Sequence, residues 1–495
     1  MILLSVISGL ALTLSFPPFS ISFFSFFALI PIFFAIEDST AKEAFKVGYV
    51  FGLTHFLTLL YWIPYPVSRY GGVPLYLSIF PYLLLGMYLA IFFGLFCLLC
   101  KFQSKSALLF YPCCWTVLEF LRSKLLTGFP WCLIGYSQYK NLHLIQIADI
   151  TGIYGISFLI VLTNTAFYLL LTKRVALIKG GLVLLISFSL TYAYGIYRLH
   201  SGINKIKGKD INVAVIQGNI DQSLKWNPAY QARTVDTYLK LTKYAFNAFK
   251  HKPYLVVWPE TAVPFYFQED GPLAKPIYKI AKNCWLILGS PAYERRESRI
   301  LYFNRAYLIS KGKTVSYYDK VHLVPFGEYV PLKKILFFVN RLVSSAGDFS
   351  SGKGIYPLRC EALAAGVMIC YEVIFPEIAR AHVKKGANIL VNISNDAWFG
   401  KTSAPYQHFA MSVFRAVENR RYLVRATNTG ISGFVDPFGK VVKKSTLFKK
   451  EVLVAKLKLI NKPLTIYAKY GDFFVYLACF FFIIIFSPCG RRPLP

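Results

Sequence analysis

The pattern of apolar and polar positions divides the chain into two parts. Through residues 1–199, long apolar runs follow one another with only short polar breaks, and one more run lies near the carboxyl end. Most of these runs are longer than a buried strand needs, and their length suits helices that cross a bilayer. The pattern therefore predicts a membrane α-helical bundle of about eight transmembrane helices. The apolar runs cover residues 3–16, 18–36, 45–65, 74–100, 106–121, 152–172, 177–197 and 472–488.

After residue 200 the periodicity changes, and short β-rich runs alternate with helical stretches. The β-rich runs, such as NVAVIQGNI and ANILVNISND, end in turn or polar residues. Alternating strands and helices predict an α/β layered domain. The expected helices cover residues 229–249, 376–385 and 405–418. We expect three regions: a helical bundle at 1–199, an α/β domain at 200–468, and a last transmembrane helix with its tail at 469–495.

Composition supports the membrane assignment. The 495 residues are 55% hydrophobic and 17% aromatic, and the mean hydropathy is positive. These values fit an integral membrane protein better than a soluble one. The first run lacks a basic leader and a small-residue cleavage site, so we expect a retained helix rather than a signal peptide.

The distribution of Lys and Arg in the short loops predicts an orientation. Loops that are rich in these residues stay on the cytoplasmic side. We therefore expect both termini inside and the 200–468 domain outside, which in a bacterial inner membrane is the periplasm. The richer side carries Lys42, Lys46, Lys101, Lys105, Lys173, Arg174, Lys179, Arg491 and Arg492, and the poorer side Arg69, Arg122, Lys124 and Lys140.

The net charge of +31 comes mainly from residues 200–470. Such an excess is typical of nucleic-acid binding, but anionic lipid headgroups or plain solvation explain it better on a membrane-tethered domain. We expect no nucleic-acid partner.

The ten cysteines indicate neither a metal site nor a dense disulfide framework. Of these, only Cys284, Cys360 and Cys370 lie in the polar domain, and a Cys284–Cys360 bridge stays open. Most of the others act as small hydrophobes inside apolar runs. These are Cys97, Cys100, Cys113, Cys114 and Cys479.

Three residues of the polar domain could carry covalent chemistry. Cys370 ends an apolar run just before a helix-like segment, where backbone N–H groups favour the nucleophilic thiolate. Glu260 ends the run 254–258, and a buried carboxylate there has the raised pKa that a general base needs. Each residue also has a bland interpretation, a structural thiol for Cys370 and a turn carboxylate for Glu260.

Lys320 lies in the β-like run 314–324. A fixed ammonium beside a reacting carbonyl stabilises the oxyanion by about 3–4 kcal/mol. The alternative is a solvated lysine that pairs with Asp319. Glu328 follows in PFGEYVPL, where glycine and proline predict a constrained loop, and it could position the amine or carry a proton.

Glu260, Lys320 and Cys370, in this order, resemble the Glu-Lys-Cys triad of the nitrilase (carbon–nitrogen hydrolase) superfamily, whose fold is an α-β-β-α sandwich. Within it, nearly the whole chain is similar to the apolipoprotein N-acyltransferases. The motifs that carry the resemblance are VIQGNIDQSLKWNP (215–228), WPETAVP (258–264), LVPFGEYVPL (323–332), ICYEVIFPE (369–377), NISNDAWFG (392–400), QHFAMSVFRAVENRRYLVRATNTGISG (407–433) and LLTGFPW (125–131).

The resemblance implies a role for each matching residue. Glu260 would be the general base, Cys370 the nucleophile, and Lys320 the oxyanion stabiliser with help from the backbone N–H of Tyr371. Positions associated with substrate handling or support of the triad match Trp226, Glu328, Tyr371 and Glu372.

The resemblance also implies a ping-pong reaction without a cofactor. A thioester on Cys370 would take its acyl chain from a membrane phospholipid, typically phosphatidylethanolamine. It would pass the chain to the α-amine of a diacylated apolipoprotein. We expect a monomer in the bacterial inner membrane. Water must be kept from the thioester, and the aromatic loops Trp398–Phe399 and Phe337–Val343 are candidates for that shield.

Two other classes stay open at this stage. A membrane-anchored nitrilase or amidase would share the triad but hydrolyse a small amide or nitrile. A transporter with a receptor domain would place charged residues within its helices. Inside the apolar runs we find mainly His55 and Glu119, so the sequence gives little sign of an ion path.

Overall fold

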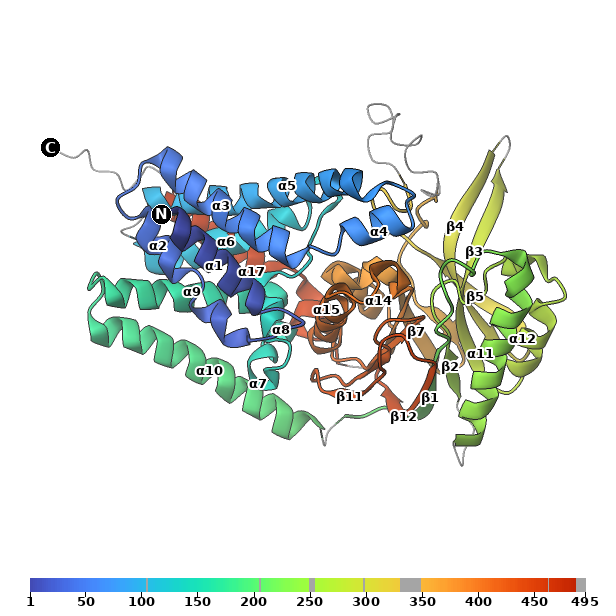
Figure 1. The fold of residues 1–495 in the computed structure, drawn as a ribbon. Coiled ribbons are helices and arrows are strands. Elements are labelled where there is room, and N and C mark those ends of the chain that lie inside the picture. Colours follow the sequence, from blue (N-terminus) through green and yellow to red (C-terminus); the bar gives the residue numbers. More distant parts are fainter. Residues whose placement is uncertain are drawn as a thin grey trace. The chain divides into compact units, whose positions relative to one another are not determined.

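A computed structural model describes residues 1–103, 106–203, 206–248, 254–296, 299–329, 349–461 and 463–486 (Figure 1). The chain forms two compact units. The first comprises Met1–Pro64, Leu75–Ser201 and Tyr470–Pro495, and the second comprises Tyr65–Pro74 and Gly202–Lys469.

The first unit is built from helices, and helical structure lies within each of the eight predicted apolar runs. Its main helices are α1 (Ile2–Leu14), α2 (Ile30–Ile36), α3 (Ala41–Leu59), α5 (Leu75–Phe102), α6 (Ala107–Arg122), α9 (Ile153–Leu171), α10 (Leu177–Ile203) and α17 (Phe473–Phe486). Shorter helical pieces are η1 (Ser22–Phe26), η3 (Leu125–Thr127), η4 (Ile134–Gln138), α7 (Leu142–Ile145) and α8 (Ala148–Thr151).

Three helices among the described residues, α5, α9 and α10, are long and apolar enough to cross a membrane. The chain is therefore a membrane protein, while the number of crossings stays a prediction.

Small residues let α3 pack closely against α5. On α3, Gly48 and Gly52 are one turn apart and both face α5. A Cβ at Gly52 would lie 2.7 Å from the Cβ of Phe93, and one at Gly48 would lie 2.7 Å from the Cβ of Cys97. Glycines at this spacing allow membrane helices to approach backbone to backbone.

Helix α3 begins at a capping box in which Glu43 N donates to Thr40 Oγ1 (3.3 Å) and Thr40 N donates to Glu43 Oε2 (2.7 Å).

The second unit contains two six-stranded sheets, with strand orders β12-β1-β2-β3-β4-β5 and β11-β10-β9-β8-β7-β6. In the first, β1, β2 and β3 are parallel, and in the second β7, β8 and β9 are parallel. The strands are β1 (Lys209–Gln217), β2 (Leu255–Val257), β3 (Trp285–Arg296), β4 (Arg299–Ser310), β5 (Lys313–Asp319), β6 (Leu358–Cys360), β7 (Leu363–Ile369), β8 (Ile389–Ser394), β9 (Leu423–Thr427), β10 (Gly433–Val435), β11 (Val441–Lys444) and β12 (Glu451–Leu459).

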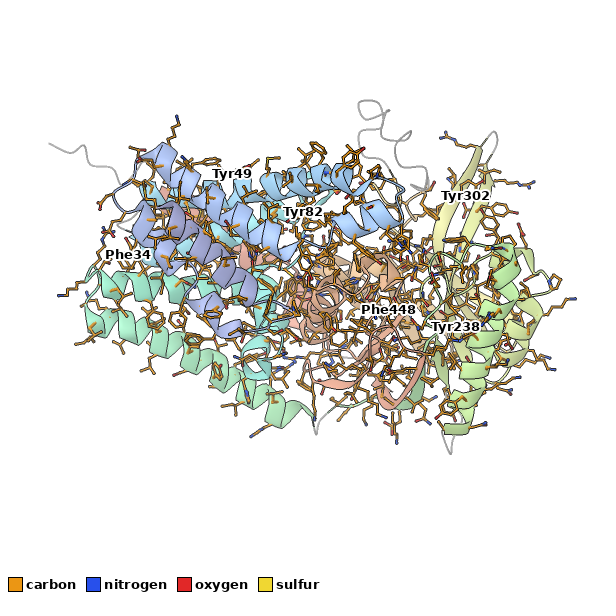
Figure 2. All side chains as sticks on the ribbon, in the orientation of Figure 1. Phe34, Tyr49, Tyr82, Tyr238, Tyr302 and Phe448 are labelled. Carbon is orange, nitrogen blue, oxygen red and sulfur yellow. The ribbon has the colours of Figure 1, made fainter. Side chains whose placement is uncertain are left out.

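Two apolar cores hold this unit together. One lies between the sheets and includes Val213 and Val257 from the first sheet with Val367 and Val391 from the second. The other lies between the first sheet and the helices α11 (Pro228–Ala248) and α12 (Ala274–Ile280). In it Tyr238, labelled in Figure 2, stacks on Trp258 with ring centroids 5.1 Å apart.

Helices α14 (Pro376–Lys384) and α15 (Ala404–Asn419) lie along the second sheet, as α11 and α12 lie along the first (Figure 1). The unit is thus the α-β-β-α sandwich that the sequence motifs predict. Every residue of β7 and β8 is buried, as is typical of parallel strands covered on both faces.

Candidate active site

The candidate residues lie where strands of both sheets end. Glu260 comes three residues after β2, Lys320 directly follows β5, and Cys370 directly follows β7. Residues just beyond a strand are held in place by the sheet but are not part of its backbone hydrogen bonding. Their side chains can therefore converge on a shared site.

Glu260 sits on a tight turn that only a neighbouring glycine permits. A Cβ on Gly289 of β3 would lie 2.7 Å from Glu260 Cα and 2.6 Å from Thr261 N. Thr261 has a φ of +46°, a left-handed conformation that is strained for a β-branched residue. The close approach of β3 and this strained residue fix the path of the backbone that carries Glu260.

The Glu260 carboxylate is buried and held on both oxygens. Oε1 accepts from the side-chain amide of Asn304 (2.7 Å), and Oε2 accepts from the backbone N–H of Asn395 (2.8 Å). Burial raises the pKa of Glu260 and the charge of Glu328 adds to this, while Lys320 opposes it. A fixed carboxyl with a raised pKa suits a group that takes and returns a proton near neutral pH.

Lys320 is 1% exposed and forms an ion pair with Glu328. Its Nζ lies 2.9 Å from Oε1 and 2.8 Å from Oε2 of that carboxylate. Burial lowers the pKa of Lys320, but the charge of Glu328, followed by those of Cys370 and Glu260, outweighs it, so the net pKa is raised. The ammonium is therefore a permanent positive charge in the site. The sequence alternative, a solvated lysine paired with Asp319, is wrong, because Asp319 pairs with Arg305 at 2.6 Å.

Glu328 is anchored by its own loop, because its Oε2 also accepts from the backbone N–H of Val324 (2.8 Å). The amide nitrogen of Asn304 donates to Glu328 Oε1 at 3.1 Å as well as to Glu260. One amide group thus joins two carboxylates. This contact fixes the separation of the candidate base from the Lys320–Glu328 pair.

Cys370 stands at the junction between β7 and the 3₁₀ helix η6 (Cys370–Ile374), with a φ of +53°. A positive φ is uncommon outside glycine, and such strain clusters at functional sites. The adjacent strand β8 holds this turn, since the Asn392 side chain donates to the carbonyls of Met368 (2.9 Å) and Cys370 (3.4 Å).

Charge links the thiol of Cys370 to the other members of the triad. Burial raises its pKa most strongly, Glu260 raises it further, and Lys320 lowers it. The resting side chain is therefore a thiol rather than a thiolate. Its proton must be taken by a base as the sulfur attacks.

Glu372 fastens the turn that carries Cys370 to the segment that carries Lys320. One of its oxygens accepts from Tyr318 Oη (3.0 Å) and from the backbone N–H groups of Val321 (2.7 Å) and His322 (3.1 Å). The other accepts from Ile369 N (2.7 Å). Burial raises the pKa of Glu372 to about 7, against the pull of the backbone donors.

The two remaining candidates, Tyr371 and Trp226, differ in how far they are buried. Tyr371 is buried, and its ring contacts His322 and Phe375 with centroids 5.9 Å and 5.1 Å away. Trp226 is 49% exposed, so its indole lies at the surface of the unit rather than among the buried polar groups. A surface aromatic suits contact with an apolar substrate chain better than support of the triad.

Sequence reasoning missed three residues that contact the candidate base, namely Lys225, Asn304 and Asn395. Lys225 donates from Nζ to the carbonyl of Glu260 (3.2 Å) and to Thr261 Oγ1. Asn395 lies in the NISND motif, in which the sequence alone indicates no role for it. Asn304 is a single amide inside the strand β4, and nothing near it in the sequence marks it.

One aromatic loop named from the sequence is held by a segment from far away in the chain. Trp398 packs edge-on against Tyr70 (centroids 5.0 Å apart), whose hydroxyl donates to Ala397 O (3.3 Å). The loop Phe337–Val343 lies outside the described residues.

The open question of a Cys284–Cys360 bridge is resolved, because both are free thiols. Among the described residues, no group of three or more His, Cys, Asp or Glu side chains could hold a metal ion.

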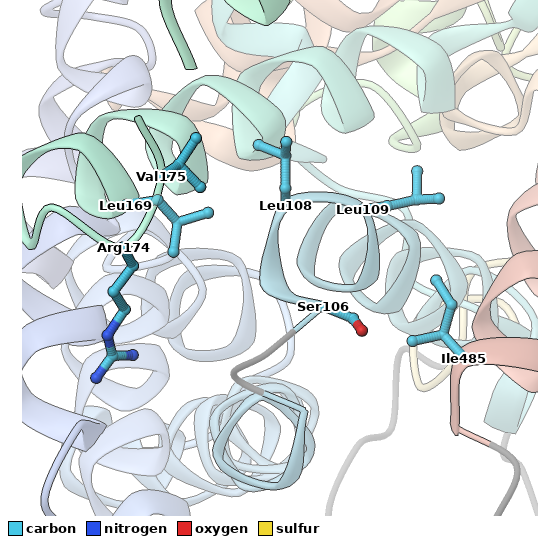
Figure 3. A pocket seen from close by; sticks show the side chains of 7 residues that line it. All are labelled: Ser106, Leu108, Leu109, Leu169, Arg174, Val175 and Ile485. Atoms are coloured by element: carbon cyan, nitrogen blue, oxygen red, sulfur yellow. The ribbon is translucent and has the colours of Figure 1, made fainter. Parts of the chain in front are cut away.

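The helical unit has a pocket of its own, of about 620 Å³ (Figure 3). Among the lining residues that the structure describes, Arg174 carries a charge and is paired with Glu37. It is lined by Ser106, Leu108, Leu109, Leu169, Arg174, Val175 and Ile485.

Two family models match the chain. Residues 8–166 match the apolipoprotein N-acyltransferase N-terminal domain, and residues 212–461 match carbon-nitrogen hydrolase. An apolipoprotein N-acyltransferase of Geobacter metallireducens is 43% identical over 96% of this chain and 92% of its own length. One of Pasteurella multocida is 32% identical, with the same shares covered.

Among solved structures, a Saccharomyces cerevisiae member of branch 10 of the nitrilase superfamily is similar at 22% identity. The match covers 51% of this chain and 92% of that one, with a TM-score of 0.40.

Proposed function

Since the chain belongs to the apolipoprotein N-acyltransferase family, it is an acyltransferase, and we propose that Cys370 carries the acyl chain between two lipid substrates. The donor is a membrane phospholipid, typically phosphatidylethanolamine. The acceptor is the α-amino group of the N-terminal S-diacylglyceryl-cysteine of an apolipoprotein. The observation that carries the proposal is that a fixed, buried carboxylate, Glu260, and the buried ammonium of Lys320 both act electrostatically on the thiol of Cys370, whose backbone has a positive φ.

In the first half-reaction, Glu260 takes the proton of Cys370 as the sulfur attacks the ester carbonyl of the phospholipid. Lys320 and the backbone N–H of Tyr371 stabilise the oxyanion. The carbon–oxygen ester bond then breaks, and Glu260 returns the proton to the departing lysophospholipid oxygen. A thioester remains on Cys370.

In the second half-reaction, the amine of the acceptor attacks the thioester carbonyl and gives its proton to Glu260. The carbon–sulfur bond breaks and the sulfur leaves with the proton from Glu260. An amide and the free thiol result. One base and one oxyanion site thus serve both halves of a ping-pong mechanism.

The proposed setting is a bacterial inner membrane, with the catalytic unit in the periplasm and the protein a monomer that binds no nucleic acid. The distribution of loop Lys and Arg supports this orientation. The reaction needs no cofactor, because the thiol, base and ammonium supply the nucleophile, the proton transfers and the charge stabilisation.

Intact-mass spectrometry of the full-length protein with phosphatidylethanolamine and no acceptor tests the proposal. We expect one acyl adduct on Cys370 that a diacylated lipopeptide removes. Cys370→Ala should form none, while the matched control Cys360→Ala, which removes another partly exposed thiol of the same unit, should behave as the wild type. Absence of any adduct, together with hydrolysis of small amides, would instead support the amidase alternative.

A further inference from the structure

Lys225 occupies an unusual position in the segment between β1 and α11. Its neighbours in the chain, Leu224 and Trp226, are 39% and 49% exposed, whereas Lys225 itself is 1% exposed. Lysine is among the residues that are almost never fully buried unless they are paired. Because this segment exposes its apolar side chains and buries its ammonium, we expect groups inside the protein that stabilise the buried charge.

Among the described residues, Lys225 has two hydrogen-bond partners, which are uncharged and belong to the turn of the candidate base. Its Nζ donates to the carbonyl oxygen of Glu260 at 3.2 Å and to the hydroxyl of Thr261. A buried charge with neutral partners is costly unless an opposite charge lies nearby. For Lys225 the nearby carboxylate is that of Glu260, whose charge raises the pKa of the lysine against burial, as does the charge of Cys370.

The charge balance of the site shows why a second ammonium matters. Two carboxylates, Glu260 and Glu328, share the amide nitrogen of Asn304 at 2.7 Å and 3.1 Å. Lys320 is within 2.9 Å of both oxygens of Glu328. One ammonium against two buried carboxylates would leave a net negative charge, which favours protonation of Glu260 and opposes a thiolate at Cys370.

We propose that Lys225 is a positioning residue for the general base, which clamps the Glu260–Thr261 turn and supplies the second positive charge that keeps Glu260 ionised and stabilises the developing thiolate. The proposal rests on the proposed function in one respect, because it takes Glu260 to be the base for Cys370. With Lys225 charged, two ammoniums balance two carboxylates. The site is then neutral overall both before and after the proton moves from sulfur to oxygen.

The charge role makes a prediction that a purely structural clamp does not. Burial lowers the pKa of Lys225 to about 8. Loss of that proton removes a cation beside Cys370, so thioester formation should decline above about pH 8. The other ionisable groups that act on this part of the site are Glu260 after β2, Lys320 and Glu328 after β5, Cys370 after β7 and Asp396 after β8.

The test measures thioester formation from phosphatidylethanolamine against pH in the full-length protein, with Lys225→Met, Lys225→Gln and Lys225→Arg. Removal of the charge should raise the pKa of Glu260. The acid limb of the pH–rate profile should then move to higher pH, and the reaction should be about tenfold slower at pH 7. Met and Gln should move the limb equally, although Gln keeps a hydrogen-bond donor. Arg should restore the acid limb and move the alkaline limb to higher pH.

A second readout needs no lipid. The rate of iodoacetamide alkylation at Cys370, followed by peptide mass spectrometry, reports the thiolate fraction directly. Lys225→Met should slow it, and Lys240→Met, which removes an exposed lysine of α11, should not. If wild-type protein forms no thioester, the proposed function fails, while alkylation still tests the role of Lys225. If Met, Gln and Arg lose the same factor with unchanged pH profiles, or if Met matches the wild type, the inference is wrong.

Discussion

At the residue scale, neutral amide groups set the geometry of the charged side chains. Asn304 donates to both carboxylates of the site, and the backbone of Asn395 holds the second oxygen of Glu260. Asn395 is itself fixed, because its side chain donates to Gln222 Oε1 (2.7 Å) and accepts from Asn428 (3.1 Å). Such a network holds the candidate base in one orientation before any substrate arrives.

Asn304→Asp should move the acid limb of thioester formation to higher pH. The substitution adds a third buried carboxylate beside Glu260, whose pKa burial already raises. A like charge raises this pKa further, so less of the base is ionised at pH 7 and the rate there should fall about tenfold. The rate deficit relative to the wild type should shrink as the pH rises and Glu260 is ionised again. The measurement is the pH profile of the acyl-enzyme by mass spectrometry.

The matched control is Asn283→Asp, which adds the same charge at an exposed position before β3. It should leave the profile unchanged. An Asn304→Asp variant whose rate falls equally at every pH would contradict the electrostatic account and leave only a geometric role for Asn304.

Gly289→Ala should displace the base without altering any catalytic side chain. The new Cβ would meet the backbone of Glu260 and Thr261 at 2.6–2.7 Å, and backbone atoms cannot swing away as a side-chain tip can. Overpacking of this kind costs about 1–3 kcal/mol, and the misplaced base should slow thioester formation by more than tenfold, since about an ångström of misplacement costs on the order of 10² in rate. Gly271→Ala, where a Cβ would have nothing within 4 Å, should change neither thermal stability nor rate. Equal behaviour of the two variants would refute the steric argument.

At the element scale, Glu372 joins the two sheets at the site. It follows β7 of the second sheet and accepts hydrogen bonds from Tyr318 of β5 and from Val321 and His322, which lie just beyond β5 in the first sheet. One buried carboxylate therefore links the segment of the nucleophile to the segment of Lys320.

Glu372→Gln should loosen this junction. The amide NH₂ group of glutamine would face a backbone N–H donor, so at least one buried donor would lose its acceptor, at about 1–3 kcal/mol. We expect a lower melting temperature in detergent and slower thioester formation. The control is Glu361→Gln, which removes a surface carboxylate paired with Lys311 and should change stability by less than about 0.5 kcal/mol. Wild-type melting of Glu372→Gln would contradict the assigned role.

At the scale of the whole molecule, the sequence predicts the helices and strands better than it predicts which residues contact one another in the site. Apolar run length predicts helices in the first unit, and strand ends predict where Glu260 and Cys370 lie, because these signals are local. Asn304 sits 44 residues from Glu260 and meets it only because β4 pairs with β3 in a particular register. Nothing in the sequence marks Lys225 as buried, and its contacts with Glu260 and Thr261 follow from the fold. The partners of both residues are set by tertiary packing, for which a single sequence carries no local signal.

Orientation of the whole molecule in the membrane can be tested by cysteine labelling. Single Lys240→Cys and Lys173→Cys variants place a thiol at an exposed position of the catalytic unit and in the Lys-rich loop after α9, respectively. Basic loops resist transfer across the inner membrane. A membrane-impermeant maleimide added to intact spheroplasts should therefore label position 240 and leave position 173 unlabelled until the cells are lysed. The unmodified protein controls for its own thiols, and labelling of position 173 but not 240 in intact spheroplasts would reverse the proposed orientation and move the acyl transfer to the cytoplasmic face.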